Sequence, residues 1–169
     1  MFSEELKKPL RMVISGNAGT QKTTIAVSFI LEMKERFDKI HIFVNHNEVL
    51  YEYLKTIDDE NKIEVYEDIE SLKSLKENVS YKILFIFDDL ELTKENKDII
   101  EDLFMRRRTN VIYIENSYLF IPQSIRETSE YAIFTTIQSH RTKKEIENEF
   151  DVKDDEEYTY KLLKKNYLK

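Results

Sequence analysis

Short apolar runs alternate with helix-like segments along this chain. Apolar residues dominate the runs at residues 11–15, 39–45, 63–66, 81–87, 110–115 and 131–136. Uninterrupted runs of this kind are typical of strands that are covered on both faces of a parallel sheet. The intervening segments place apolar residues at helical spacing and predict helices over residues 22–36, 48–57, 69–79, 93–107, 122–130 and 140–150. Strands that alternate with helices predict an α/β fold with a mainly parallel central sheet.

Two of the predicted helices begin with recognisable signals. Thr93 is expected to cap the helix that follows it, and Pro122 is expected at the first helical position of another. After residue 137 the chain becomes strongly charged, with an acidic stretch and then a basic tail that contains tyrosines. We predict a core over residues 1–137 and a charged helical extension over 138–169, which packs on the same domain or projects from it.

A glycine-containing loop separates the first predicted strand from the first predicted helix. Both glycines of the chain fall in this loop, whose sequence is Gly16-Asn17-Ala18-Gly19-Thr20-Gln21-Lys22-Thr23-Thr24. Strand, glycine loop, Lys-Thr and helix is the order of a phosphate-binding P-loop, in which backbone N–H groups and the helix N-terminus bind anionic oxygens. Every residue of the loop is therefore a candidate nucleotide-binding residue. Lys22 is expected to reach the β- and γ-phosphates, and the Thr23 hydroxyl to bind Mg²⁺.

One position of this loop departs from the P-loop pattern. Gln21 stands where G-x-x-x-x-G-K-[ST] has glycine. Glycine is favoured there because the backbone adopts a conformation that is costly for other residues and approaches the phosphates closely. A side chain at position 21 is compatible with weaker nucleotide binding, with a shifted loop or with an engineered change, and the sequence does not decide among these. The alternative for the whole segment is an ordinary strand–turn–helix with a chance Lys-Thr pair.

Polar residues suited to phosphate chemistry follow two other predicted strands. Asp88 and Asp89 end the most hydrophobic run of the chain, which is a Walker B pattern. Asp88 is expected to hold the hydrated Mg²⁺, because this ion prefers oxygen ligands and keeps several waters. Asp89 is expected to orient or deprotonate the attacking water. Asn116 ends the next apolar strand and is a candidate sensor of the γ-phosphate. The plainer interpretation of all three is that they fill turns or cap the next element.

Several arginines are candidates for a group that acts on the nucleotide of a neighbouring subunit. Phosphoryl transfer builds negative charge that an arginine can stabilise. The candidates are Arg126 and the run Arg106-Arg107-Arg108, and within the run Arg107 and Arg108 are preferred. The alternative is that the run complements the dipole at a helix C-terminus and that Arg126 is a surface residue.

Composition narrows the classes of function. A chain of 169 residues suits one domain, and its net charge of −7 argues against a general nucleic-acid coat protein but not against a ring that touches DNA through a few residues. The absence of cysteine excludes a disulfide framework and thiolate metal sites, and the histidines lack metal-ligand spacing. No run approaches the roughly 20 apolar residues of a membrane span, and the first residues do not resemble a signal peptide, so we expect an intracellular protein.

The order of these motifs resembles that of the poxvirus-type DNA-packaging ATPases of large DNA viruses, within the FtsK/HerA branch of P-loop NTPases. The similarity spans about residues 9–137, and its matching segments are residues 9–16, 83–90, 107–114, 116–118, 121–126 and 131–134. This chain departs from the family pattern in having Thr109 for a common histidine and Asn116-Ser117 for a common Gln-Thr.

That resemblance implies a three-layer P-loop NTPase fold of the RecA/FtsK type and a motor that uses ATP and Mg²⁺. It further implies a homo-oligomeric ring that moves double-stranded DNA into a preformed capsid. A capsid or portal-vertex protein would be a further partner, in the host cytoplasm, a viral factory or the virion. At the matching positions, the resemblance assigns nucleotide and metal binding to Lys22 and Thr23, and metal binding and activation of water to Asp88 and Asp89. It assigns the sensor role to Asn116 and an intersubunit role to Arg126 or Arg107-Arg108.

Two other functions remain open at this stage. One is a small nucleotide kinase, although the adjacent Asp88 and Asp89 suit the activation of water better, and no arginine-rich lid follows the fourth strand. The other is a nucleotide-binding subunit with impaired hydrolysis, for which Gln21 is the best support.

Overall fold

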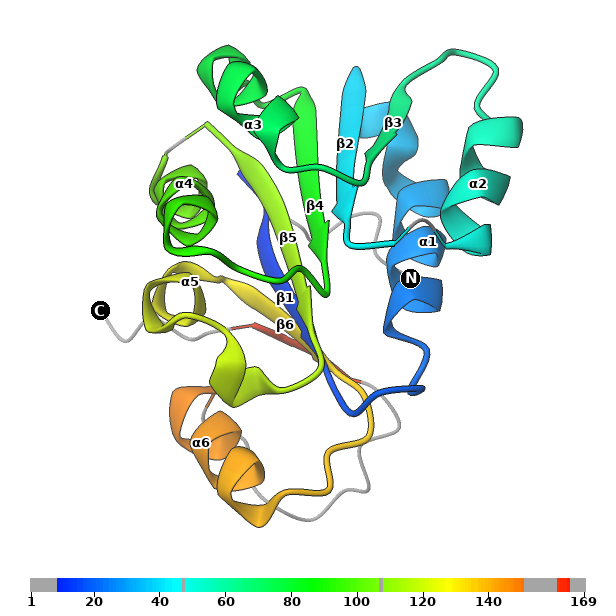
Figure 1. Ribbon diagram of the computed structural model, residues 1–169. Helices are drawn as coiled ribbons and strands as arrows, with labels where there is room; N and C mark the ends of the chain where they lie inside the picture. The colour runs from blue at the N-terminus through cyan, green and yellow to red at the C-terminus, as the bar shows by residue number, and fades with distance from the viewer. Residues whose placement is uncertain (1–8, 47, 107, 151–160, 165–169) are drawn as a thin grey trace.

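The computed structural model describes residues 9–46, 48–106 and 108–150, together with the backbone of residues 161–164. A central sheet separates two layers of helices (Figure 1). The parallel strands of this sheet are β1 (Arg11–Ser15), β2 (Lys39–Val44), β3 (Ile63–Tyr66), β4 (Ile83–Asp88), β5 (Asn110–Glu115) and β6 (Tyr131–Phe134). A further strand, β7 (Lys161–Lys164), pairs antiparallel to β6. The predicted α/β fold with a mainly parallel sheet is confirmed.

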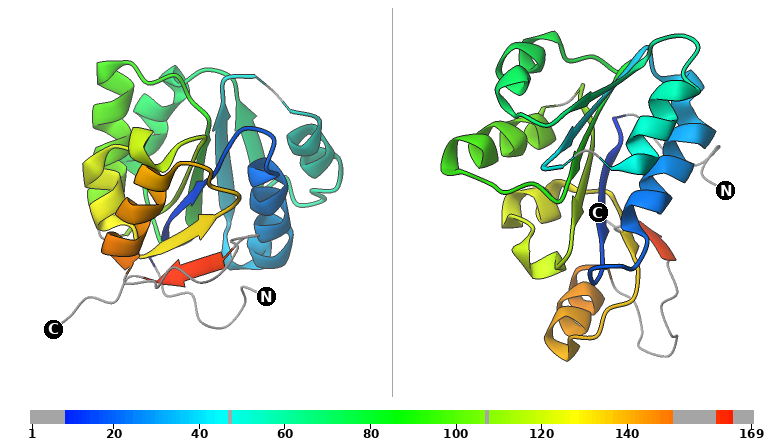
Figure 2. Two further views of the ribbon diagram at one scale, coloured as in Figure 1. Left: turned by 90° about the horizontal axis from the view of Figure 1, so that it is seen from below. Right: turned by 45° about the vertical axis from the view of Figure 1, so that its right-hand side comes forward.

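The helices lie on both faces of the sheet. Their bounds are α1 (Lys22–Met33), α2 (Val49–Thr56), α3 (Glu70–Leu75), α4 (Lys94–Met105), α5 (Gln123–Thr128) and α6 (His140–Phe150). Short 3₁₀ turns extend three connections: η1 (Lys34–Arg36), η2 (Lys76–Asn78) and η3 (Tyr118–Phe120). Helices α1 and α2 cover one face, and α3, α4 and α5 cover the other, with α6 beyond α5 (Figures 1 and 2). None of the described helices is both long enough and apolar enough to span a membrane.

The strands fill both cores because successive side chains point to opposite faces of the sheet. On β1, Met12 and Ile14 are buried in the core under α1 and α2, whereas Val13 is buried in the core under α4 and α5. Strands with both faces covered need apolar residues at nearly every position, which explains the uninterrupted runs in the sequence.

The strand order positions the candidate site. The order is β3-β2-β4-β5-β1-β6-β7, so β5 lies between the strand that precedes the glycine loop and the strand that ends in Asp88. Because the carboxyl ends of parallel strands meet at one edge of a sheet, the loops after β4, β5 and β1 lie side by side. In Figure 1 this edge is at the bottom, where the chain passes from β1 into α1.

Two predicted element assignments are wrong. Pro122 occupies the N-cap position of α5 rather than its first helical position, so the helix begins at Gln123. The predicted helical extension is a strand at Lys161–Lys164, where it pairs with β6. The pairing satisfies backbone groups of β6 that would otherwise form an open sheet edge. Residues 151–160 and 165–169 of that extension lie outside the described residues. The predicted helix over 140–150 is confirmed as α6.

Candidate nucleotide-binding site

The glycines of the loop are required by its geometry. A Cβ atom on Gly16 would lie 1.6 Å from the Thr135 hydroxyl oxygen, so no side chain fits there. Thr135 is held in place because its N–H donates to the Ser15 carbonyl at 2.9 Å, just after β6 ends. Gly19 has a φ of +76°, in the left-handed region that favours glycine. The end of β6 therefore packs directly against the start of the loop.

Gln21 adopts the conformation that glycine was expected to supply. Its φ of 64° and ψ of 26° are left-handed, and it forms the N-cap of α1 without a capping hydrogen bond from its side chain. For a residue with a Cβ atom, this conformation costs roughly 1–2 kcal/mol of free energy. The loop thus keeps its left-handed turn before Lys22, with backbone strain at Gln21 and its exposed side chain at the rim of the site.

The candidate residues from three strand ends meet in one hydrogen-bonded cluster. The Thr23 hydroxyl donates to Asp88 Oδ2 at 2.9 Å. Lys22 Nζ donates to Asn116 Oδ1 at 2.8 Å, and Asn116 Nδ2 donates to Asp89 Oδ1 at 2.6 Å. Asn116 therefore joins Lys22 to Asp89. The prediction that these side chains converge is confirmed, because β5 places Asn116 between the other two strand ends.

Burial acts on the charged groups of this cluster in opposite directions. It lowers the pKa of Lys22, while the charges of Asp89 and Asp88 act to raise it. Burial raises the pKa of Asp88, while hydrogen bonds from Tyr51 and Thr23 act to lower it. The Lys22 ammonium and the Asp88 carboxylate are both incompletely hydrated. A ligand that carries negative charge together with a divalent cation would therefore stabilise the charged form of each group.

A pocket of about 410 Å³ opens beside this cluster. Its walls come from the loop, from the start of α2 and from the ends of β4 and β5, and the lining residues are Ala18, Gly19, Gln21, Lys22, Thr23, Thr24, Glu48, Leu50, Asp88, Asp89 and Asn116. The other predicted loop residues, Gly16, Asn17 and Thr20, do not line it but shape the loop. The Asn17 carbonyl accepts from Lys22 Nζ at 3.2 Å and from the Thr20 hydroxyl at 2.6 Å.

Four residues that follow β2 belong to the site but are absent from the sequence-based candidates. Glu48 and Leu50 line the pocket, and Tyr51 donates to Asp88. Asn45 donates from its side chain to the Asp89 carbonyl at 2.7 Å. The signal that could have found Asn45 is the one used for Asp88, namely a polar residue at the end of an apolar strand, and Glu48 lies in the same connection three residues later. Tyr51 carries no such signal, because its spacing in α2 is that of an ordinary core residue.

The candidate arginines lie away from this pocket. Arg126 Nη1 pairs with Glu149 and lies 3.6 Å from Glu145 Oε1, and its guanidinium stacks over the Tyr118 ring at 5.2 Å. These contacts give Arg126 a role within its own subunit, so it is not the free surface residue of the alternative interpretation. The intersubunit role stays a prediction, and it would require Arg126 to leave Glu149.

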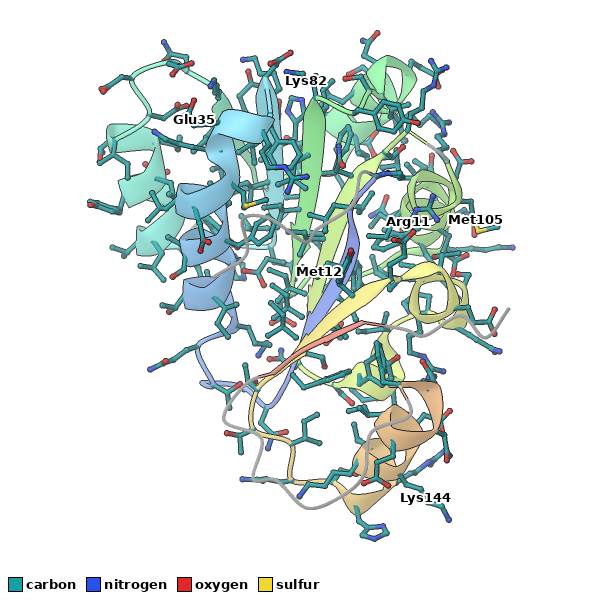
Figure 3. All side chains as sticks on the ribbon, turned by 180° about the vertical axis from the view of Figure 1, so that it is seen from behind. Arg11, Met12, Glu35, Lys82, Met105 and Lys144 are labelled. Atoms are coloured by element: carbon teal, nitrogen blue, oxygen red, sulfur yellow. The ribbon has the colours of Figure 1, made fainter. Side chains whose placement is uncertain are left out.

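The described residues of the arginine run, Arg106 and Arg108, lie at the opposite edge of the sheet. Arg106 caps the end of α4 and pairs with Asp102 at 2.6 Å, as the helix-terminus alternative expected. Arg108 is exposed just before β5 begins, and Arg107 lies outside the described residues. In Figure 3, Met105 and Lys82 lie in the upper half, whereas the passage from β1 into α1 lies in the lower half. Arg106 and Arg108 therefore do not reach the pocket of their own subunit.

A protein family matches almost the whole chain. The model of the family described as Poxvirus A32 protein covers residues 2–164. The chain belongs to this family. The resemblance stated from the motifs is thereby confirmed. No curated protein matches the chain.

Solved structures with the same fold are also found. The genome packaging NTPase B204 from Sulfolobus turreted icosahedral virus 2, in complex with sulfate, has a TM-score of 0.67 at 14% identity, over 95% of this chain and 94% of that one. Its AMPPCP complex has a TM-score of 0.61 at 15% identity, over 92% and 97%. B204 from Sulfolobus Turreted Icosahedral Virus, described as the DNA-packaging ATPase, has a TM-score of 0.64 at 17% identity, over 92% and 97%. These likenesses show that the family member described here has the fold of the P-loop ATPases.

Proposed function

We propose that this chain is the ATP-hydrolysing subunit of a motor that moves double-stranded viral DNA into capsids. The observation that carries the proposal is the cluster in which Lys22 and Thr23 meet Asp88, Asp89 and Asn116 at one edge of the sheet. Family membership and the shared fold with B204, whose structures include a complex with AMPPCP, support it.

The residues of the pocket fit ATP and Mg²⁺. Lys22 supplies a cation that is underhydrated and is adjacent to the phosphate-binding loop. Thr23 and Asp88 supply oxygen donors, the type that Mg²⁺ prefers. The described residues contain no group of three or more His, Cys, Asp or Glu that could hold a metal ion by itself. Mg²⁺ usually keeps several waters and binds phosphate oxygens, so it needs only one or two protein oxygen ligands. When bound, Mg²⁺ would neutralise charge that develops on the phosphates.

Each residue of the cluster then has a defined task. Lys22 Nζ exchanges the oxygens of Asn17 and Asn116 for phosphate oxygens, and Asp89 orients a water and accepts its proton. Asn116 now bridges Lys22 and Asp89, so a γ-phosphate that attracts Lys22 breaks this bridge. Asn116 would in this way couple the arrival of the γ-phosphate to the position of Asp89, which is the sensor role.

Further partners follow from the family role. We propose a homo-oligomeric ring that surrounds duplex DNA and docks on a capsid or portal-vertex protein. Its place would be the host cytoplasm, a viral factory or the virion. The net charge of −7 is consistent with DNA contact through a small part of each subunit.

The decisive experiment is steady-state ATP hydrolysis by the protein and by Gln21→Gly, each with and without duplex DNA. We expect DNA to stimulate turnover, and Gln21→Gly to bind ATP more tightly because no side chain at position 21 limits how closely the phosphates approach the loop backbone. Asn61→Gly is the matched control, since Asn61 has a φ of 52° in an exposed turn outside the pocket. Asp89→Asn is expected to reduce turnover by about 10²-fold or more, the usual contribution of a positioned general base.

Three other results would each contradict the motor. A rate of ATP hydrolysis that changes neither with DNA nor with protein concentration would show that hydrolysis is not coupled to DNA or to oligomerisation. Phosphate transfer to a nucleoside monophosphate, detected directly, would identify a kinase. A native protein that does not bind ATP, with binding restored in Gln21→Gly, would identify a subunit with impaired nucleotide handling.

A further inference from the structure

A buried tyrosine reaches the Walker B carboxylate from a different helix. Tyr51 lies in the first turn of α2, is 0% exposed, and belongs to the core under α1 and α2. Its hydroxyl donates to Asp88 Oδ2 at 2.6 Å. The only polar atom of this side chain is thus aimed out of an apolar core at the residue expected to hold the metal.

Both donors to Asp88 reach the same oxygen. Oδ2 accepts from Tyr51 and, at 2.9 Å, from the Thr23 hydroxyl. No side chain or N–H group among the described residues donates to Oδ1, although Asp88 lines the pocket. Two donors on one oxygen restrict rotation of the carboxylate and leave the other oxygen available to a ligand in the pocket.

The tyrosine is suited to a permanent donor role. A phenol ionises only near pH 10, so the Tyr51 hydroxyl carries its proton at neutral pH and can donate it to Asp88. Its ring belongs to the same buried core as Ala26 and Val27 of α1, the helix that carries Thr23. Metal sites keep their geometry because residues with fixed rotamers hold the ligand-binding side chains in place.

We propose that Tyr51 is a positioning residue that orients the Asp88 carboxylate toward the hydrated Mg²⁺ of the bound nucleotide. The inference rests on the proposed function, because it presumes that Asp88 faces a magnesium–nucleotide complex. Tyr51 touches neither nucleotide nor metal and acts only through Asp88.

The test is binding of a fluorescent ATP analogue during titration with Mg²⁺, for the wild type, Tyr51→Phe and Tyr113→Phe. Tyr51→Phe keeps the ring and removes only the donor. We expect it to raise the Mg²⁺ concentration for half-maximal binding by about tenfold, the scale of a hydrogen bond to a charged group. Affinity in EDTA should stay unchanged. Tyr113→Phe is the matched control, because Tyr113 is also buried and its hydroxyl has no hydrogen-bond partner among the described residues.

A double variant separates positioning from general support of the fold. In the Asp88→Asn background, Tyr51→Phe should not change the Mg²⁺ dependence further. The double variant remains informative if Tyr51→Phe alone folds poorly. Asp88→Asn removes the charge of the partner, so the loss of the tyrosine hydroxyl no longer leaves a buried carboxylate without a donor. An unchanged Mg²⁺ dependence in Tyr51→Phe, an equal loss of affinity in EDTA, or additive effects in the double variant would overturn the inference alone. A wild type that binds no nucleotide would overturn the proposed function and the inference with it.

Discussion

At the scale of single residues, the polar side chains of the site are held by partners that are distant in the sequence. Asn116 accepts from Lys22 and donates to Asp89, so one amide satisfies a buried ammonium and orients a carboxylate. Its own backbone N–H donates to Glu115 Oε1 at 2.7 Å. Glu115 is half-buried at the end of β5, so Asn116 contacts a third charged residue in addition to Lys22 and Asp89.

The charge of Glu115 makes the stability of the protein depend on pH. Burial raises the pKa of Glu115 above 4.5, against the hydrogen bonds from the backbone of Asn116 and Ser117. The folded chain therefore binds more protons here than the unfolded chain between pH 4.5 and the raised pKa, so acidification through this window is stabilising. Glu115→Gln lacks this gain. We expect the variant to exceed the wild type in free energy of unfolding most at pH 7, with the difference shrinking toward pH 4.5.

Urea denaturation of both proteins at several pH values between 7 and 4.5 measures this difference. The exposed Glu91→Gln is the control, and its effect should stay within about 0.5 kcal/mol. A difference for Glu115→Gln that does not vary with pH would show that burial does not penalise this carboxylate.

At the scale of elements, the connection from β4 to α4 is fixed at both ends. The Asn45 side chain donates to the Asp89 carbonyl at 2.7 Å and accepts from the Glu91 N–H at 3.1 Å. At the other end, the Thr93 hydroxyl accepts from the Asn96 N–H at 3.3 Å and caps α4, as the sequence predicted. The connection that carries Asp89 is thus tied to β2 and to the start of α4.

Removal of the cap should weaken α4 without changing the pocket. Thr93→Ala leaves the first N–H groups of α4 without this acceptor, so we expect a loss of about 1 kcal/mol in the free energy of unfolding. Thr93→Ser keeps the hydroxyl and should lose much less. Chemical denaturation monitored by circular dichroism distinguishes the two variants, and equal losses in both would attribute the effect to the threonine methyl group instead.

At the scale of the whole molecule, one carboxylate of α6 joins this helix to η3 and α5. Glu149 accepts from the Tyr118 hydroxyl and from Arg126, and Ile146 and Phe150 pack in the core on the same side. Tyr118 follows Asn116, the candidate sensor, by two positions. The last helix, the candidate intersubunit arginine and the loop after β5 therefore form one connected unit.

A mixing experiment tests whether Arg126 acts on a neighbouring subunit. Arg126→Ala should lose about 1–3 kcal/mol in the free energy of unfolding, because it removes a charged hydrogen-bond partner of Glu149. If Arg126 also acts between subunits, Asp89→Asn and Arg126→Ala, each inactive alone, should recover measurable ATP hydrolysis when mixed. Arg108→Ala, exposed at the opposite edge, is the comparison for the second candidate. Mixtures without recovered activity would leave Arg126 with the intramolecular role alone.

Local sequence was sufficient for strands β1 through β6, for the approximate positions of the helices and for most of the site. The apolar runs predicted β1 through β6, and polar residues at the ends of three of them predicted Lys22, Asp88, Asp89 and Asn116 as neighbours. This worked because strand periodicity and strand-end polarity are properties of adjacent residues, and because parallel strands bring their carboxyl ends to one edge. The family resemblance rested on the same local motifs in order.

The tertiary structure alone decided what depends on which elements are neighbours. It placed β5 between β1 and β4, so Asn116 bridges Lys22 and Asp89. It brought Tyr51 to Asp88, and it turned residues 161–164 from a predicted helix into a strand beside β6. A core tyrosine and an edge strand look like any others in the sequence, because their partners are fixed by packing across the fold and not by the residues next to them.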